Sequence, residues 1–150
     1  MMMEEKIINA KGLVMGRLAS SVSKMLLKNE KVTIVNAEEA IITGHREAAM
    51  SKFSQRIQIK TYTDPLKGPR FVRMPDRILR ASIKGMLPIK RARGREAVHH
   101  LKVFIGVPES LEGKETIQVK DAQYKGTRKF LKLREVSKIL GKNVEYGEHK

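Results

Sequence analysis

The chain has 150 residues, of which 31 are Lys or Arg and 16 are Asp or Glu, giving a net charge of +15. This length predicts one domain over residues 1–150, and the 41% hydrophobic content excludes a wholly disordered chain. The absence of cysteine excludes disulfides, thiol catalysis and cysteine-ligated zinc, and is typical of a protein in a reducing cytosol.

So large a positive excess repels itself unless a polyanion neutralises it, which leaves nucleic acid or an anionic membrane as the expected partner. A membrane is the weaker choice. Apolar runs such as 32–35 and 101–107 are far shorter than the roughly 20 residues of a spanning helix. The first residues, Met-Met-Met-Glu-Glu-Lys, contain no apolar signal segment, so we expect no export and a cytoplasmic protein.

The positive charge is concentrated in the middle of the chain. Residues 67–102 carry 11 basic and 2 acidic side chains, a net +9, and hold seven of the 12 arginines. Most runs of charged residues form a solvated face, but such a face would contain interspersed acidic residues. Because Arg grips phosphate oxygens through two N–H groups and stacks on bases, this segment is predicted to bind nucleic acid.

The chain begins with the pattern of a strand, a turn and a helix. Residues 6–9 predict a short strand, and Lys11-Gly12 predicts the turn. Apolar residues then recur at helical spacing, namely Leu18, Ala19, Val22, Met25 and Leu26. Another face of the same predicted helix carries three cations, Arg17, Lys24 and Lys28.

Two strands and a helix are predicted next. Residues 32–35 and 40–43 are β-branched or apolar and read as strands. The link at 36–39 is so short that we expect one antiparallel strand pair, and hence a mixed or mostly parallel sheet. Residues 45–60 predict a helix, although Ile57, Ile59 and Thr61 also alternate as a strand would. Its inward-facing side chains would be Ala49, Met50, Phe53 and Ile57.

Residues 61–75 are predicted to form an extended arm, because three prolines and a glycine fall within this short span. The arm has few apolar residues to bury, so we expect it to become ordered on its partner.

A helix is predicted to follow, with Asp76 as the residue that caps its free N–H groups. Leu79, Ile83 and Met86 would face inward. Three cations at helical spacing, Arg77, Arg80 and Lys84, would face outward. Pro88 would end the helix, and residues 88–95 would form a basic loop.

The last third of the chain is less informative. Ala97, Val98 and Leu101 predict the inner face of a further helix, and residues 102–105 predict a core strand. Residues 109–128 are polar and loop-rich. A final amphipathic helix is predicted from Leu133, Val136 and Leu140, closed by Gly141. Strands separated by helices indicate an α/β layered domain.

Five blocks of sequence resemble one family, in that family's order. They are residues 10–20 (AKGLVMGRLAS), 35–38 (VNAE), 42–44 (ITG), 85–88 (GMLP) and 101–108 (LKVFIGVP). The family that these blocks resemble is the universal large-subunit ribosomal protein conventionally numbered thirteen. The resemblance implies a three-layer α/β/α domain with a four-stranded sheet, which binds large-subunit ribosomal RNA early and supports assembly of the subunit.

The resemblance also indicates a branch of the family. Only Asn29, Glu30 and Lys31 separate the first helix from the strand at Val32, whereas the bacterial form carries an insertion there. The eukaryotic form usually extends further at its C-terminus, so the archaeal type is preferred. The partners implied are large-subunit ribosomal RNA and neighbouring large-subunit ribosomal proteins, with no membrane, no small-molecule substrate and no cofactor.

An enzyme is the second hypothesis. Residues 12–16 place two glycines before a helix, but they lack the GxGxxG spacing of a dinucleotide turn, so an ordinary strand-to-helix turn is favoured. His99 and His100 are adjacent and would point in different directions on a helix, which does not suit a metal. His99 is expected to be either an RNA contact or a plain surface residue, and His100 to be partly buried. Glu38 and Glu39 are expected to be solvated in a turn.

The sequence therefore predicts a non-catalytic protein that recognises phosphates, sugar hydroxyls and RNA shape, because its seven Phe and Tyr residues form no single-strand reading motif. A nucleotide-binding α/β enzyme and a general DNA-binding protein remain as alternatives. No catalytic, cofactor-binding or metal-binding residue is predicted. The predicted RNA-binding residues are Arg17, Lys24, Lys28, Lys67, Arg70, Arg73, Arg77, Arg80, Lys84, Lys90, Arg91, Arg93, Arg95, His99 and Lys102.

Overall fold

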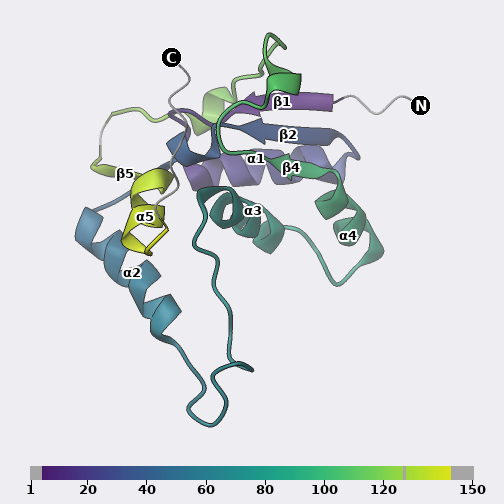
Figure 1. Ribbon diagram of the computed structural model, residues 1–150. Coiled ribbons are helices and arrows are strands. Elements are labelled where there is room, and N and C mark those ends of the chain that lie inside the picture. Colours follow the sequence, from purple (N-terminus) through teal and green to yellow (C-terminus); the bar gives the residue numbers. More distant parts are fainter. Residues whose placement is uncertain (1–4, 127, 143–150) are drawn as a thin grey trace.

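The computed structural model describes residues 5–126 and 128–142, which form an α/β fold (Figure 1). In chain order its elements are β1 (Glu5–Asn9), α1 (Met15–Leu27), β2 (Lys31–Val35), η1 (Ala37–Glu39), β3 (Ile41–Thr43), α2 (Arg46–Gln58), α3 (Pro75–Met86), α4 (Ala92–His99), β4 (Leu101–Val103), η2 (Glu109–Leu111), η3 (Lys120–Ala122), β5 (Phe130–Lys132) and α5 (Leu133–Ile139). The α/β class expected from the sequence is confirmed.

The centre of the fold is a parallel sheet with the strand order β1-β2-β4. Ile8 pairs with Ile34, and Val32 pairs with Leu101. Because side chains alternate along a strand, these four residues point to the same face, where each is at most 1% exposed. Strands buried in this way need β-branched and apolar residues, which explains why the sequence pattern located β1 and β2 correctly.

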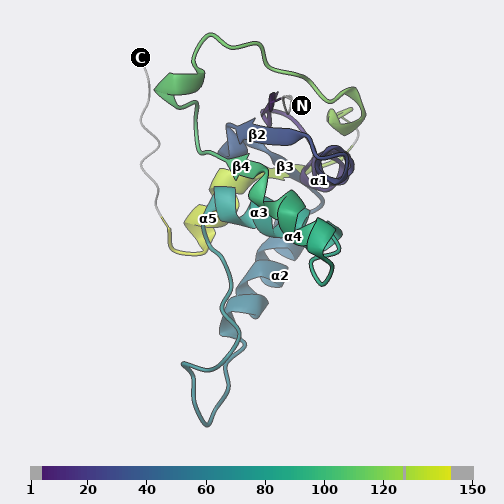
Figure 2. The same cartoon turned by 90° about the vertical axis from the view of Figure 1, so that its right-hand side faces the viewer.

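Three helices, α1, α3 and α4, cover that face of the sheet (Figures 1 and 2). Leu18, Val22 and Leu26 of α1 are fully buried, as are Leu79 and Ile83 of α3. Each side chain of this kind contributes about 1.5–3 kcal/mol when it is removed from water. The inner faces of these helices are therefore fixed by packing, and their outer faces are left open.

The second face of the sheet is covered by an irregular segment rather than by a helical layer. Ile7 and Val35 pack there against Leu111 of η2, with Val107 beside them. In the part of the chain that the structure describes, the main sheet has three strands instead of the expected four. The fourth predicted strand is β3, which follows the 3-10 turn η1 and lies in a separate sheet.

β3 forms a separate two-stranded antiparallel sheet with β5, in which Ile42 pairs with Leu131. An antiparallel strand pair is therefore present as expected, but β3 pairs with the distant β5 and not with β2. The sequence pattern missed β5, which has only three residues. The final helix α5 is confirmed, since Leu133 and Val136 are at most 2% exposed and Gly141 follows at φ +81°.

The helix predicted at 45–60 is also confirmed as α2, but it lies at the edge of the body and none of its residues is buried. The predicted inward residues Ala49, Met50, Phe53 and Ile57 are half-buried. Residues 59–74, which follow, contain no helix or strand and project from the body beyond α2 (Figures 1 and 2).

Helix α3 differs from the prediction at both ends. Its N-cap residue is Met74 and its first residue is Pro75, so Asp76 lies inside the first turn and makes no side-chain capping bond. Proline suits this position because its missing N–H would have no partner there. Met86 was expected to face inward but is 48% exposed, and Ile78, which is 4% exposed, faces inward in its place.

Helix α4 begins at Ala92, inside the range 88–95 that was expected to be a basic loop. Arg93 and Arg95 consequently lie on a helix, and only residues 87–91 connect α3 to α4. Strand β4 begins one residue earlier than predicted, so Leu101 belongs to the sheet and not to a helix.

Candidate nucleic-acid interface

All fifteen predicted RNA-binding side chains are exposed. They come from α1 (Arg17, Lys24, Lys28), the arm (Lys67, Arg70, Arg73), α3 (Arg77, Arg80, Lys84), the α3–α4 connection (Lys90, Arg91), α4 (Arg93, Arg95, His99) and β4 (Lys102). Exposure is a requirement for binding, and contact with RNA stays a prediction for each of them.

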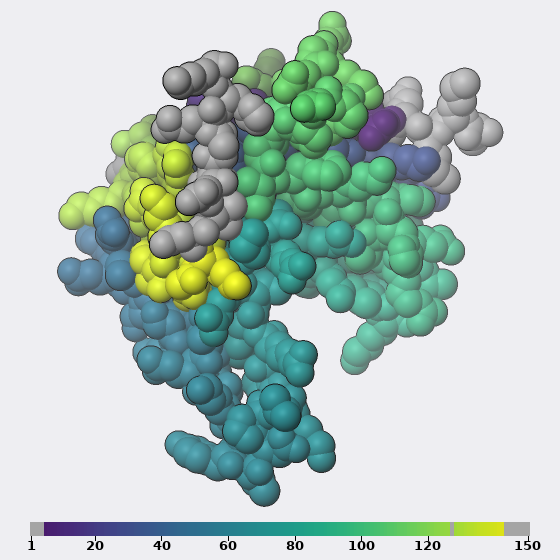
Figure 3. Space-filling model, viewed as in Figure 1, coloured from purple at the N-terminus to yellow at the C-terminus, as the bar shows by residue number. Residues whose placement is uncertain are grey.

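The centre of the candidate interface is the outer face of α3. Arg77, Arg80 and Lys84 are exposed, whereas Leu79 and Ile83 on the same helix are fully buried. Helix α3 lies between the arm and α4, and the surface is hollowed between these two projections (Figures 1 and 3). We call the cations of the arm, α3 and the α3–α4 connection the basic surface.

The connection between α3 and α4 is held tightly. Gly94 is buried, and a Cβ added to it would lie 2.1 Å from the carbonyl oxygen of Pro88. The Arg91 N–H donates to the Pro88 oxygen at 3.0 Å, and the Gly94 N–H donates to the Arg91 oxygen at 3.1 Å. Only glycine permits this approach, so Gly94 fixes where Lys90 and Arg91 stand relative to α4.

Two predicted RNA-binding arginines also bind the protein's own backbone. Arg93 Nη2 donates to the carbonyl oxygen of Leu27 at 2.6 Å, which joins α4 to the end of α1. Arg73 Nη1 donates to the carbonyl oxygen of Leu140 at 3.5 Å, which joins the base of the arm to α5. Because a guanidinium has five N–H donors, each side chain retains donors for a phosphate.

The structure does not bring His99 and Lys102 together with the basic surface. Lys102 is the register partner of Thr33, so its side chain points to the sheet face opposite the helices. His99 and Lys102 line a separate hollow together with Glu5 and Lys31. His100 is half-buried as expected, and its Nδ1 is buried without a hydrogen-bond partner.

Arg17 has neighbours that the sequence reasoning missed. It lines a hollow of about 230 Å³ with Lys125 and Arg128, between the start of α1 and the loop before β5. Tyr124 Oη donates to the carbonyl oxygen of Arg128 in the same loop. Residues 125–129 contain three cations, but the polar, loop-rich sequence around them has no pattern that places them beside Arg17.

The expectation that Glu38 and Glu39 are solvated is wrong. Glu38 is 8% exposed, and its two carboxylate oxygens accept from the Gly106 N–H at 3.2 and 3.0 Å. Glu39 accepts from Lys132 Nζ at 2.6 Å and from Arg134 Nη1 at 3.0 Å. Both carboxylates therefore join η1 to distant segments, which local sequence could not reveal.

The pKa of Glu39 follows from this environment. Partial burial alone would raise it, but the hydrogen bond and charge of Lys132, together with those of Arg134, outweigh that effect. The pKa of Glu39 therefore lies below its ordinary value. Lys132 and Arg134 help to stabilise the fold through their contacts with this carboxylate.

The described residues contain neither a candidate metal cluster nor a helix that could span a membrane. Among residues 5–126 and 128–142, no group of three or more His, Cys, Asp and Glu side chains could hold a metal ion. No helix in these ranges is long and apolar enough to cross a bilayer. The described residues therefore form a small α/β protein with an exposed basic surface.

Comparison with known sequences identifies the family. The profile of the family described as Ribosomal protein L13 matches residues 4–110. The chain is 46% identical over 136 residues to the large ribosomal subunit protein uL13 of Methanosphaera stadtmanae, covering 90% of this chain and 96% of the relative. It is 45% identical over 138 residues to the uL13 of Methanosarcina barkeri, with the same coverage of both chains.

A further relative, the uL13 of Methanocaldococcus jannaschii, is 40% identical over 136 residues. The chain belongs to the ribosomal protein L13 family. The resemblance seen in five blocks of the sequence, and its archaeal type, are confirmed.

Proposed function

We propose that this chain is a structural constituent of the large ribosomal subunit, which binds large-subunit ribosomal RNA through its basic surface and supports assembly of the subunit. The observation that carries the proposal is the exposed cationic face of α3, set between the arm and α4, in a member of a ribosomal protein family. On this account the whole chain acts as one domain, resides in the cytoplasm, and meets neighbouring large-subunit proteins.

The mechanism is neutralisation of several phosphates by a preformed body and an extended arm. The buried faces of α1, α3 and α4 hold the body rigid, so the cations of α3 are placed before RNA arrives. Arg side chains bind phosphate through paired N–H groups and suit folded RNA, whose wide minor groove presents sugar hydroxyls and phosphates. The arm then adds Lys67 and Arg70 at a distance from the body.

The proposal is tested by reversing charge on α3. Replacing Arg77, Arg80 and Lys84 by Glu should abolish binding to large-subunit ribosomal RNA, because three attractive contacts become repulsive at the centre of the surface. The circular dichroism spectrum and melting temperature should stay near those of the native protein, since all three side chains are exposed. Unfolding of this variant would show that the assignment of faces on α3 is wrong.

A charge-matched control separates a specific surface from general polycation behaviour. Lys114, Lys120 and Lys138 are exposed and lie outside the basic surface. Their replacement by Glu changes the net charge by the same amount and should weaken binding far less. Equal loss in both triple variants would contradict the proposal.

A further inference from the structure

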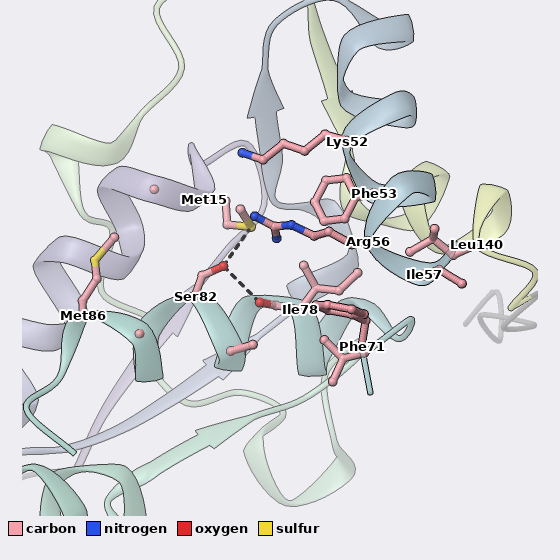
Figure 4. Close-up of a pocket in the computed structure, with 14 residues that line it drawn as sticks. Met15, Lys52, Phe53, Arg56, Ile57, Phe71, Ile78, Ser82, Met86 and Leu140 are labelled. Carbon is pink, nitrogen blue, oxygen red and sulfur yellow. Dashed lines mark hydrogen bonds between the residues drawn. The ribbon is translucent and has the colours of Figure 1, made fainter. Parts of the chain in front are cut away.

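A hollow of about 440 Å³ lies at the base of the arm, between α1, α2 and α3 (Figure 4). Lys52, Phe53 and Arg56 reach it from α2, and Phe71 of the arm lies on the opposite side. The site is large enough for a nucleobase with its sugar, and it is open to solvent at the surface.

The walls of this hollow are apolar and partly aromatic. Phe71 and Val72 are each 39% exposed, whereas Ile78, which also lines the hollow, is 4% exposed and belongs to the core. The Arg56 guanidinium carbon lies 6.0 Å from the centroid of the Phe53 ring. An aromatic ring with a neighbouring guanidinium is the combination on which unpaired bases stack.

The charge around the hollow has one sign. Among the described residues that line it, the ionisable side chains are Lys52 and Arg56. A second hollow of about 340 Å³ continues from it along the arm, sharing Ile57 and Phe71. Its ionisable lining residues are Lys60, Arg70 and Arg73. The pair of hollows thus alternates aromatic or apolar surface with five cations, which complements a polyanion.

We infer that the larger hollow receives one unstacked nucleotide of ribosomal RNA, whose base lies against Phe71 and Phe53 and whose flanking phosphates bind Lys52 and Arg56. This inference rests on the proposed function. An unpaired base suits the site better than an acidic peptide does, because the aromatic walls offer planar surfaces for its faces and further cations line the adjoining hollow along the arm.

The test uses the full chain bound to large-subunit ribosomal RNA. Short-wavelength ultraviolet light joins stacked bases to aromatic side chains, and mass spectrometry of the product should find a nucleotide on Phe71 or Phe53. Two variants probe the site without changing charge. Gly85→Leu fills the hollow, since a Cβ at Gly85 meets nothing within 4 Å, and Phe71→Ala removes one wall.

Each variant should weaken RNA binding by roughly tenfold, the loss expected for one base stack, with an unchanged slope of affinity against salt. The control is Phe104→Ala, because Phe104 is 37% exposed and lies away from the hollow, at the end of β4. It should bind within about twofold of the native chain. Thermal melts show whether each variant is folded. If Gly85→Leu does not fold, Phe71→Ala alone tests the inference.

The outcomes are distinguishable. If the native chain binds ribosomal RNA, but the nucleotide is found elsewhere and both variants bind as tightly as it does, the inference is wrong and the proposed function stands. If a photoreactive group at position 71 captures a protein in assembled subunits instead of RNA, the hollow is a protein-docking site and the inference is again overturned. If the native chain shows no saturable RNA binding, both proposals fail.

Discussion

Single residues of this protein show that charge has two separate uses. The cations of α3 are exposed and free to meet a phosphate, whereas Lys132 and Arg134 bind Glu39 and hold β5 and α5 to η1. Glu38 binds the Gly106 N–H from within the body. These two acidic residues therefore stabilise the body, and the near absence of acids from residues 67–102 leaves the cations of that segment available.

The Glu39 cluster makes part of the stability depend on pH. Because the folded pKa of Glu39 is lowered, its contribution is present above its unfolded pKa and is lost as pH falls through the folded value. Glu39→Gln should therefore lower the free energy of unfolding by about 1 kcal/mol at neutral pH, since its partners are partly solvated. The difference from the native protein should shrink below about pH 4 in chemical denaturation curves.

The matched control is Glu135→Gln. Glu135 pairs with Arg46 at 3.9 Å, and both side chains are at least 40% exposed, so little stability should depend on this pair. If Glu39→Gln proved no more destabilising than Glu135→Gln, the account of Glu39 would be wrong.

At the scale of elements, the α3–α4 connection is the most constrained part of the basic surface. Gly94→Ala should lower the melting temperature by several degrees, because the new Cβ meets the Pro88 backbone and overpacking costs about 1–3 kcal/mol. Gly85→Ala is the control, since it adds a methyl to α3 with open space around it and favours the helix. Calorimetry should show opposite shifts for the two variants, and a neutral Gly94→Ala would contradict the packing described.

The arm contributes to binding differently from α3. Replacing Lys67, Arg70 and Arg73 by Gln should reduce the slope of log affinity against log salt by roughly two to three, because each lost phosphate contact releases about one counterion fewer. The melting temperature should change little, as these side chains are exposed and only Arg73 makes a bond to the body. An unchanged salt slope would exclude the arm from the interface.

The sequence predicted long, strongly patterned elements well. The buried strands β1 and β2 and the helices α1, α2, α3 and α5 follow from local apolar spacing. The strand predicted at 40–43 is confirmed as β3, whereas the three-residue β5 was missed. The pairing of β3 with β5 spans about ninety residues, so it depends on tertiary packing. For the same reason the sequence could not show that β3 leaves the main sheet.

The candidate site was predicted in outline only. Charge counting located the arm, α3 and the segment that became α4, all of which are exposed. It could not show that Lys102 points to the opposite side of the sheet, because that depends on strand register. It also could not show that Lys52 and Arg56 line one hollow with Phe71, since this depends on α2 lying beside the arm.

At the scale of the whole molecule, an α/β body presents the cations of α3 and of the α3–α4 connection, and the arm adds further cations beyond it. A net charge of +15 would attract any polyanion, so specificity must come from the arrangement of the cations rather than from their number. That arrangement is what distinguishes a ribosomal building block from a general DNA-binding protein.

The most direct measurement is binding to fragments of large-subunit ribosomal RNA across a series of salt concentrations, with duplex DNA as competitor. The account predicts a complex specific to one fragment, with affinity that falls steeply with salt and survives excess DNA. Weak binding shared equally by all the fragments and by the DNA would contradict it, because the basic surface would then act only as a general polycation.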